Sequence, residues 1–445
     1  MEDASSRRQQ QQERIHGAVL AALARGDWLT PSEWTSVVAR VSRRWRATVD
    51  AVVHAQQTLL VTHPTCARHH IPRRSERPER LQFVLERCRA RWPRLRCVDE
   101  FASATPAQLA RFHSDVHVDS IHRLAAKIER SMAALDALEL QDRAISPRAT
   151  VTARSTSDGG GGGGATRVHR GGSFNHDEPP CSPSSSFFVK RPERPKSKAS
   201  YYAQFEYIDL DSDTILMRHT LAASLAAIGG VCHAIDRVLA GDARNAFCVV
   251  RPPGHHAEPQ RSMGFCFFNN VGVGACHALE THQLSRVAII DFDVHHGNGT
   301  QRGVERAPQL LYVSLHQSPL FPHSGFARER GAHDNIVNIP LPARTPASVY
   351  RDQFRRVVGP RVEAFAPQLV LISAGFDGHE KDPLSDMRLR AGDFYWMTQE
   401  IVRMAWRCCD GRVVSVLEGG YMASALADSA EQHVRALAHG AVPQW

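Results

Sequence analysis

The ten cysteines of this 445-residue sequence are scattered, and no two of them form a C-x-x-C pair. This spacing argues against a disulfide framework and against a zinc cluster held by cysteines, and it is typical of reduced intracellular thiols. The first residues lack the apolar centre of a secretory signal peptide. No apolar run approaches the roughly 20 residues of a membrane span, so we expect an intracellular protein with no membrane partner.

The sequence also lacks the marks of specific nucleic-acid recognition, although its formal net charge is +8. Arginine-rich stretches lie mainly in the first half, without the interleaved aromatic residues of a stacking surface and without a zinc-finger pattern. A basic, solvated surface is the better interpretation, and we expect no direct sequence-specific DNA binding. The basic stretch at 190–198 is a weak nuclear signal that a solvated loop explains better. The compartment therefore stays open, with the nucleus slightly favoured over the cytoplasm.

Composition divides the chain into three parts. Residues 1–55 are polar and rich in arginine and glutamine, which predicts a helical or partly disordered N-terminal extension. Residues from about 146 to 200 contain a glycine run, a serine run and several prolines, and such a segment buries too little apolar surface to repay its ordering entropy. We therefore expect one catalytic domain at 56–445, interrupted by a flexible low-complexity insertion at about 146–200.

What the sequence does contain is a regular alternation of apolar segments after the insertion. Helices are predicted at Leu221–Leu239, at Phe354–Phe365 and after Asp393, which we expect to be an N-cap. Between them lie continuously apolar runs that are typical of strands buried on both faces. Strands separated by helices predict an α/β fold with a single open, mostly parallel β-sheet and helices on both faces. The predicted strands are Phe247–Val250, Val287–Ile290, Leu310–Leu315, Leu369–Ser373 and Val413–Leu417.

Polar residues follow each of these apolar runs directly. Open α/β sheets bind ligands outside the carboxyl ends of their strands, so these residues should meet in one crevice. A chance arrangement of so many imidazoles, carboxylates and a phenol explains the pattern poorly. The residues concerned are His255, His256, Asp291, Asp293, His295, His316, Asp377 and Tyr421.

Three of these residues suit a metal ion. Asp293 and His295 are two positions apart, so their side chains share one side of an extended segment. With the distant Asp377 they would form a site of two carboxylates and one imidazole that leaves a coordination position open, as in catalytic zinc sites. A zinc-bound water is a good nucleophile near neutral pH.

The other polar residues suit acid–base chemistry. The pair His255 and His256 can transfer protons near neutral pH, and Asp291 and Asn298 could each orient one imidazole. Tyr421 carries a neutral donor for a developing oxyanion, and the preceding Gly-Gly would let its loop approach. Each residue taken alone also has a purely structural interpretation, as a packed histidine or a turn tyrosine.

Five ordered motifs resemble those of the zinc-dependent histone deacetylases: R-P-P-G-H-H-A-E, M-G-F-C-F-F-N-N, D-F-D-V-H-H-G-N-G-T, S-A-G-F-D and L-E-G-G-Y. The likeness runs from about Thr58 to the end of the sequence, apart from the insertion. Asn298 and Glu418 resemble the class II pattern. The resemblance implies the arginase/deacetylase fold, one catalytic zinc ion and a structural potassium ion.

The resemblance also implies a role for each matching residue. Asp293, His295 and Asp377 would hold zinc. His256 would be the general base and acid, with His255 as its electrostatic partner and with Asp291 and Asn298 behind them, and Tyr421 would polarise the acetyl carbonyl. Gly264, Phe265 and Phe321 would line the acyl-lysine tunnel, and Asp115 would hold the substrate backbone at its rim. Potassium would be held by Asp291, Asp293, His295, Ser314 and Leu315. His296 is left without a catalytic role.

Three features depart from the family pattern. The insertion is unusual, and the segment P-L-F-P-H-S-G has Leu320 where an aromatic residue is common, followed by His323. Arg80 matches an early arginine of the family, but the usual His-Pro-Glu start is altered to S-E-R-P-E-R-L, so its role stays open.

The function implied by the resemblance is hydrolysis of the acetyl amide of N6-acetyl-lysine in histones or other proteins, with release of acetate. Acetylated histone tails or other acetylated proteins, and a corepressor-type complex, would be the partners.

Two alternatives remain. One is an acetylpolyamine amidohydrolase of the same superfamily, in which we would expect a glutamate directly after Asp382-Pro383. This sequence has Leu384 at that position, which favours a peptide substrate. Glu380 nearby keeps the polyamine alternative open. An inactive acetyl-lysine-binding scaffold is disfavoured because every implied catalytic position carries competent chemistry.

Overall fold

In a computed structural model, the described residues are 57–71, 75–145 and 207–440. The predicted N-terminal extension and the predicted insertion at about 146–200 lie outside them. The chain divides into two units: one comprises residues up to Glu129 and from Tyr207 onward, and the other begins at Arg130. The larger unit contains all the predicted strands. The nine described cysteines are all unpaired.

In the described part of the chain, eight parallel strands form one sheet in the order β2-β1-β5-β10-β9-β6-β7-β8. The predicted α/β fold with a parallel sheet is therefore confirmed. The central strands are continuously buried, because helices cover both faces. The strands are β1 (Thr58–Val61), β2 (Arg96–Val98), β5 (Asn245–Cys248), β6 (Val287–Asp291), β7 (Leu310–Gln317), β8 (Ile336–Leu341), β9 (Leu369–Ala374) and β10 (Val413–Leu417).

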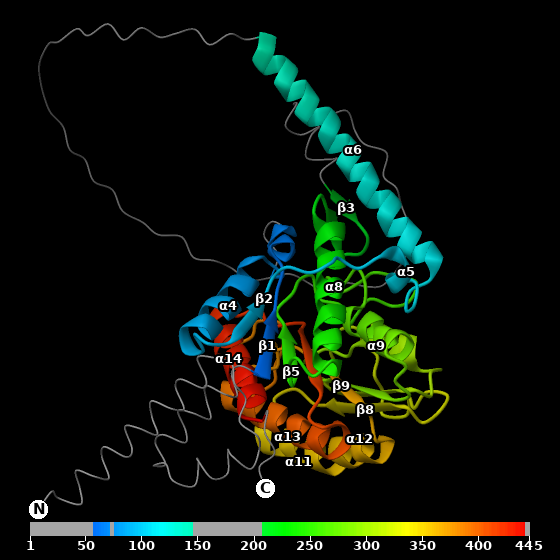
Figure 1. Cartoon of the computed structure of the whole chain (residues 1–445), viewed down its shortest axis with the longest axis vertical. Coiled ribbons are helices and arrows are strands. Elements are labelled where there is room, and N and C mark those ends of the chain that lie inside the picture. The colour runs from blue at the N-terminus through cyan, green and yellow to red at the C-terminus, as the bar shows by residue number, and fades with distance from the viewer. Residues whose placement is uncertain (1–56, 72–74, 146–206, 441–445) are drawn as a thin grey trace, which may run out of the picture. The chain divides into compact units, whose positions relative to one another are not determined.

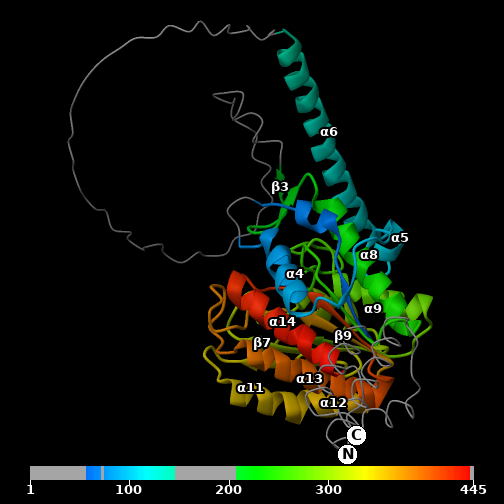
Figure 2. The same ribbon diagram turned by 60° about the vertical axis from the view of Figure 1, so that its left-hand side comes forward.

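Helices lie on both sides of this sheet (Figures 1 and 2). Helices α8 and α9 pack together on one side, and α4, α13 and α14 pack together on the other. A short antiparallel pair, β3 (Tyr207–Asp209) and β4 (Ile215–Met217), stands apart from the main sheet. The α-helices are α4 (Glu79–Arg91), α5 (Pro106–Leu109), α6 (Asp115–Ile145), α8 (Thr220–Leu239), α9 (Asn270–Thr281), α10 (Asn298–Val304), α11 (Ala347–Gln353), α12 (Gly359–Phe365), α13 (Ala391–Cys409) and α14 (Ala423–His439).

Helix α8 has the length and composition of a membrane span, contrary to the expectation that no segment approaches one. Its most apolar window is 67% buried inside the protein, and the helix packs against β1, β5 and β10. The apolar surface of α8 is thus used in the core of the larger unit.

Two details of the predicted helices differ from the structure. Helix α13 begins at Ala391, so Asp393 is not its N-cap. Instead Asp393 lies in the first turn, where its carboxylate accepts a hydrogen bond from the backbone N–H of Arg390 at 2.9 Å. The helix predicted at Phe354–Phe365 is the end of a longer helical stretch that starts at Ala347 and includes a π-helical turn at Phe354–Val358.

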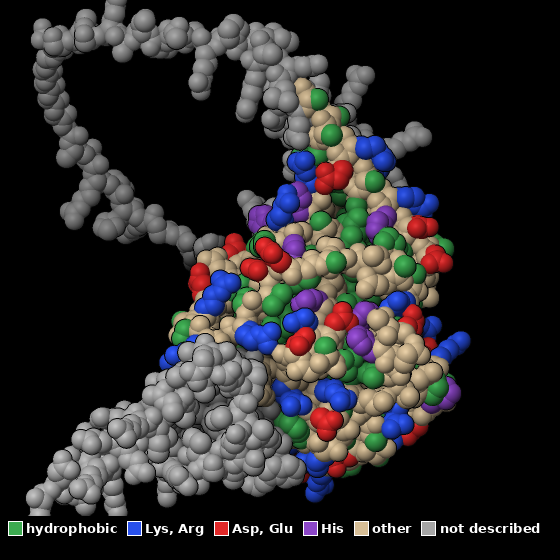
Figure 3. Space-filling model, viewed as in Figure 1, with side chains coloured by type: hydrophobic (Ala, Val, Ile, Leu, Met, Phe, Trp, Pro, Cys, Tyr) green, Lys and Arg blue, Asp and Glu red, His purple; other side chains and the backbone are tan. Residues whose placement is uncertain are grey.

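Charges of both signs are interspersed on the face of the molecule shown in Figure 3. Ion pairs also occur among the half-exposed and exposed side chains of the described residues: Arg361 contacts Asp334 at 2.6 Å, and Arg237 contacts Asp242 at 3.2 Å. This face therefore resembles a mixed solvated surface more than a continuous basic patch.

Candidate active site

The segments that follow five adjacent strands meet at the carboxyl edge of the sheet. Strands β5, β10, β9, β6 and β7 are parallel neighbours in that order. The residues after them therefore converge at one edge, where parallel α/β sheets bind their ligands. The buried polar residues gathered there are His255, His256, Asp291, Asp293, His295, Asp377 and Glu418.

Asp293, His295 and Asp377 form a compact group of potential metal ligands. The Nδ1 atom of His295 lies 3.1 Å from Asp293 Oδ1 and 3.1 Å from Asp377 Oδ2, and one ligand atom of each residue lies within 4.8 Å of the others. Both carboxylates are fully buried, and the imidazoles of His295 and, at 3.8 Å from Asp293, His255 are the nearby groups that can balance their charge. A divalent cation would balance these charges, and the donor set fits zinc.

Two glycines make room for these carboxylates. A Cβ atom on Gly375 would lie 1.9 Å from Asp293 Oδ2, and one on Gly419 would lie 2.0 Å from Asp377 Oδ2. The backbone N–H of Gly419 also donates to Asp293 Oδ2 at 2.8 Å. The E-G-G-Y segment therefore positions the carboxylates of the ligand group, in addition to carrying Tyr421.

His255 is bound to Asp291, its proposed partner. Its Nδ1 lies 3.1 Å from Asp291 Oδ2, which also accepts a hydrogen bond from the hydroxyl of Tyr312 at 2.9 Å. Burial lowers the pKa of His255, but the charges of Asp293 and Asp291 outweigh burial and raise its pKa to about 10.

His256 has the opposite tendency. Its Nδ1 lies 2.9 Å from the side-chain oxygen of Asn298, whose amide nitrogen donates to Glu258 at 2.8 Å. This chain of hydrogen bonds places the proton of a neutral His256 on Nδ1 and leaves Nε2 as an acceptor. Burial, together with the positive charges of His255 and His295, lowers the pKa of His256 well below its ordinary value.

Tyr421 is held from three directions. Its backbone N–H donates to the carboxylate of Asp382 at 2.6 Å, and its ring lies edge-on to Phe265 with centroids 5.9 Å apart. The guanidinium of Arg80 lies 4.9 Å from its ring centroid. Burial raises the pKa of Tyr421 well above its ordinary value, so its hydroxyl remains a neutral donor.

The structure assigns Arg80 a place in a buried network that the sequence did not reveal. Arg80 donates to the backbone carbonyls of Gly420 and Glu418 at 2.7 and 2.5 Å and to Glu76 at 3.1 Å. Glu76 also receives two hydrogen bonds from Arg251, the first residue of the R-P-P motif. Glu76 lies in the altered S-E-R-P-E-R-L segment, where the matching Glu of the family start could have signalled it.

The predicted substrate-binding residues differ in how closely they approach His256 and the Tyr421 loop. A Cβ on Gly264 would lie 2.5 Å from the His256 ring, and the Phe321 ring lies with its centroid 5.1 Å from that of His256. The backbone N–H of Leu384 donates to Asp382, the acid that holds the Tyr421 loop. Asp115 is exposed at the first residue of α6.

The residues of the predicted potassium site are neighbours across two strands. Asp291, the last residue of β6, pairs in register with Ser314 of β7, which Leu315 follows. The Ser314 hydroxyl lies 2.8 Å from His316 Nδ1. His296 contacts Ser324 and Gln301 at 2.8 Å each, which is consistent with a structural role for this histidine.

Comparison with known proteins identifies the family. Residues 74–437 match the family model described as the histone deacetylase domain. The chain is 31% identical to the Type-2 histone deacetylase 2 of Dictyostelium discoideum over 86% of this chain and 21% of that protein. It is 44% identical to the histone deacetylase-like amidohydrolase of Pseudomonas aeruginosa over 42% of this chain and 50% of that protein. The chain thus spans half or less of the length of these two relatives.

A solved structure, described as the crystal structure of the HDA15 HD domain, shares the fold. The TM-score is 0.65 at 25% sequence identity, and the match covers 86% of this chain and 88% of the other. The family match, over residues 74–437, spans the strand-end motifs that build the site described above. The chain belongs to the histone deacetylase family.

Proposed function

We propose that this protein hydrolyses the acetyl amide of N6-acetyl-lysine in histones or other proteins, with zinc as its cofactor, and releases acetate. The observation that carries the proposal is the grouping of Asp293, His295 and Asp377 at the edge that also holds His256 and the Tyr421 loop. Asn298, which contacts His256, and Glu418, which directly precedes the Gly-Gly-Tyr segment, favour a class II-like member of the family.

The residues divide the reaction between them. Zinc held by Asp293, His295 and Asp377 would supply a Lewis acid for the amide carbonyl and for a water molecule. Nε2 of His256 would accept the proton of the attacking water and later return it to the leaving lysine amine. The Tyr421 hydroxyl would donate a hydrogen bond to the oxyanion that develops on the former carbonyl oxygen.

The surroundings of the loop at Asp382 favour a peptide over a polyamine substrate. A polyamine amidohydrolase would need an acidic group available for a second cationic nitrogen. Glu380, the acid that keeps this alternative open, is engaged with Arg390 at 3.1 Å. The position after Asp382-Pro383 carries the apolar Leu384. Acetylated histone tails or other acetylated proteins, in a corepressor-type complex and with the nucleus favoured, are the partners and location that we propose.

The test is turnover by the purified full chain of an acetyl-lysine peptide and of an acetylated spermidine, before and after zinc removal. We expect the peptide to be cleaved preferentially, and we expect cleavage to stop after chelation and to return with added zinc. Preferential cleavage of the polyamine would contradict the proposed substrate. Full activity in the chelated protein would contradict the proposed cofactor.

A further inference from the structure

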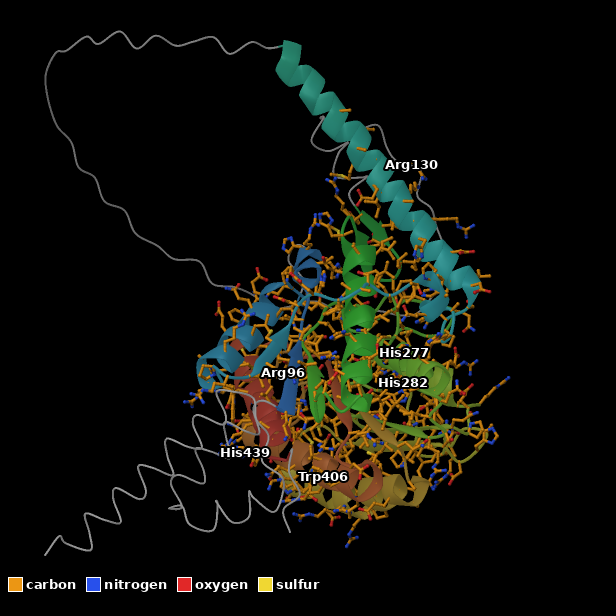
Figure 4. All side chains as sticks on the ribbon, viewed as in Figure 1. Arg96, Arg130, His277, His282, Trp406 and His439 are labelled. Atoms are coloured by element: carbon orange, nitrogen blue, oxygen red, sulfur yellow. The ribbon has the colours of Figure 1, made fainter. Side chains whose placement is uncertain are left out.

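A second group of potential metal ligands lies away from the candidate active site, where helices α8 and α9 end. Asp236 belongs to α8, His277 belongs to the last turns of α9, and His282 is the residue at which α9 ends. The Nε2 atoms of both histidines lie 2.7 Å from the same carboxylate oxygen, Oδ1 of Asp236. One ligand atom of each residue lies within 4.8 Å of the others. Figure 4 shows the two histidines close together beside α8 and α9.

The packing of the two helices fixes this group in place. Gly274 of α9 lies against α8, and a Cβ atom there would lie 2.7 Å from Val231 and 3.1 Å from Ile235. The two helices are therefore in close contact at Gly274, about one helical turn before His277, which faces Asp236. Ligands carried by rigid, closely packed helices are preorganised for a metal ion better than ligands carried by loops.

The second nitrogen of His277 is also engaged. Its Nδ1 lies 3.2 Å from the hydroxyl oxygen of Thr281, which also accepts a hydrogen bond from Arg111 at 3.0 Å. Arg111 itself lies 3.4 Å from Nδ1. A histidine that binds a metal through one nitrogen usually donates the other N–H to a nearby acceptor, which the Thr281 hydroxyl provides. The charge of Arg111 is balanced by Glu280, at 3.0 Å.

The position favours a cation for two further reasons. The carbonyl groups at the end of α9 give that end a partial negative charge, which attracts cations. The Asp236 side chain is 46% exposed and that of His282 is 27% exposed, so an ion and a coordinating water can reach them. In a tetrahedral zinc site with bonds of about 2.0–2.2 Å the ligand atoms lie about 3.3 Å apart, and small side-chain rotations would open the 2.7 Å contacts to that spacing.

We propose that Asp236, His277 and His282 form a second divalent-metal site, suited to zinc, that joins the end of α8 to the end of α9. Two imidazoles and one carboxylate are a borderline donor set that selects zinc over magnesium or calcium. The site is separate from the Asp293 group and its role is to hold the two helices together, so it does not depend on the proposed deacetylase activity.

The test is the zinc content of the purified full chain after dialysis against a zinc buffer, measured by mass spectrometry. We expect His282→Ala and Asp236→Asn each to bind one zinc ion fewer per chain than the unchanged protein. The exposed His333 lies outside the group, and His333→Ala should bind as much zinc as the unchanged protein. Asp377→Asn reports separately on the active-site metal.

Circular dichroism establishes that each variant is folded, and the near-isosteric Asp236→Asn keeps the test valid if His282→Ala unfolds. The proposal is overturned if the unchanged protein, His282→Ala and Asp236→Asn all hold the same number of zinc ions. A loss of zinc confined to Asp377→Asn would likewise overturn it, while supporting the active-site assignment.

Discussion

The guanidinium of Arg80 lies 4.9 Å from the ring centroid of Tyr421 and donates at 2.7 Å to the carbonyl of Gly420, the residue just before that tyrosine. One side chain from α4 thus fixes both the backbone and the ring of the residue proposed to polarise the substrate. Arg80 is only 2% exposed, so these bonds have no competition from bulk water.

Replacing Arg80 should therefore affect both stability and turnover. Arg80→Leu leaves Glu76 and two backbone carbonyls with fewer donors, and we expect a loss of about 3 to 5 kcal/mol in the free energy of unfolding. Arg80→Lys keeps the charge but loses the forked geometry, and it should show a smaller loss with a reduced kcat. Urea unfolding and steady-state kinetics measure the two effects. Equal stability of all three proteins would contradict the role of this network.

Tyr421→Phe should reduce kcat about 10²- to 10³-fold, because one donor to the oxyanion is lost while the ring remains. The contact with Arg80 is preserved by phenylalanine, so the free energy of unfolding should change little. Tyr207, which is 45% exposed in β3, provides the matched control Tyr207→Phe. Unchanged acetyl-lysine turnover in Tyr421→Phe would contradict the assigned role of the hydroxyl.

Gly419→Ala should weaken zinc binding at the Asp293 group. The new Cβ would lie 2.0 Å from Asp377 Oδ2 and 2.7 Å from Asp293 Oδ2, so both carboxylates must move. We expect at least a tenfold loss of zinc affinity and of kcat/KM, comparable with other disturbances of groups around a metal, which cost about 10- to 100-fold. Gly392 of α13 has open space around its Cβ position, and Gly392→Ala should leave both quantities unchanged. A zinc affinity of Gly419→Ala equal to that of this control would count against the ligand assignment.

His433 should make the protein less stable in mild acid. Burial lowers the pKa of His433 from 6.5 to about 3, and its ring nitrogens are engaged by Thr398 at 2.7 Å and Ser415 at 2.8 Å. Because the unfolded chain binds the proton more readily, this stabilisation is complete above pH 6.5 and is lost progressively as the pH falls toward 3. Between pH 7 and pH 5 the loss is about 2 kcal/mol.

The measurement is urea unfolding of the unchanged protein and of His433→Gln at pH 7 and pH 5. We expect the variant to lose about 2 kcal/mol less than the unchanged protein over this interval. His333→Gln, on the surface, should behave like the unchanged protein. An identical pH dependence in His433→Gln would show that the buried imidazole is not the source of the effect.

The sequence revealed the central strands because each is an uninterrupted apolar run between two helical patterns. It did not reveal the four-residue β1. It also missed the two edge strands, β8, in which Asn338 and Pro340 interrupt the apolar run, and β2, which has the exposed Arg96. These edge strands are recognised through their pairing with a neighbour, which is a property of the folded sheet.

The same distinction applies to the site. Asp293 and His295 could be grouped from their spacing and the strand before them, whereas the link from Arg251 to Glu76 joins residues 175 positions apart. The contact of the Tyr312 hydroxyl with Asp291 was not predicted, because Tyr312 is part of an apolar run in the sequence. Long-range partners of buried charges are set by the crossing of helices and strands, and spacing along the chain carries no information about them.

The order of the strands has a consequence for how the protein is made. Strand β10 follows every other described strand in the sequence, yet it lies between β5 and β9 in the middle of the sheet. A growing chain on the ribosome that has not yet reached Val413 lacks the strand that pairs with both β5 and β9, and it also lacks the Tyr421 loop. Assembly must therefore wait for this late strand, and until then the unpaired edges are open to contacts with other chains.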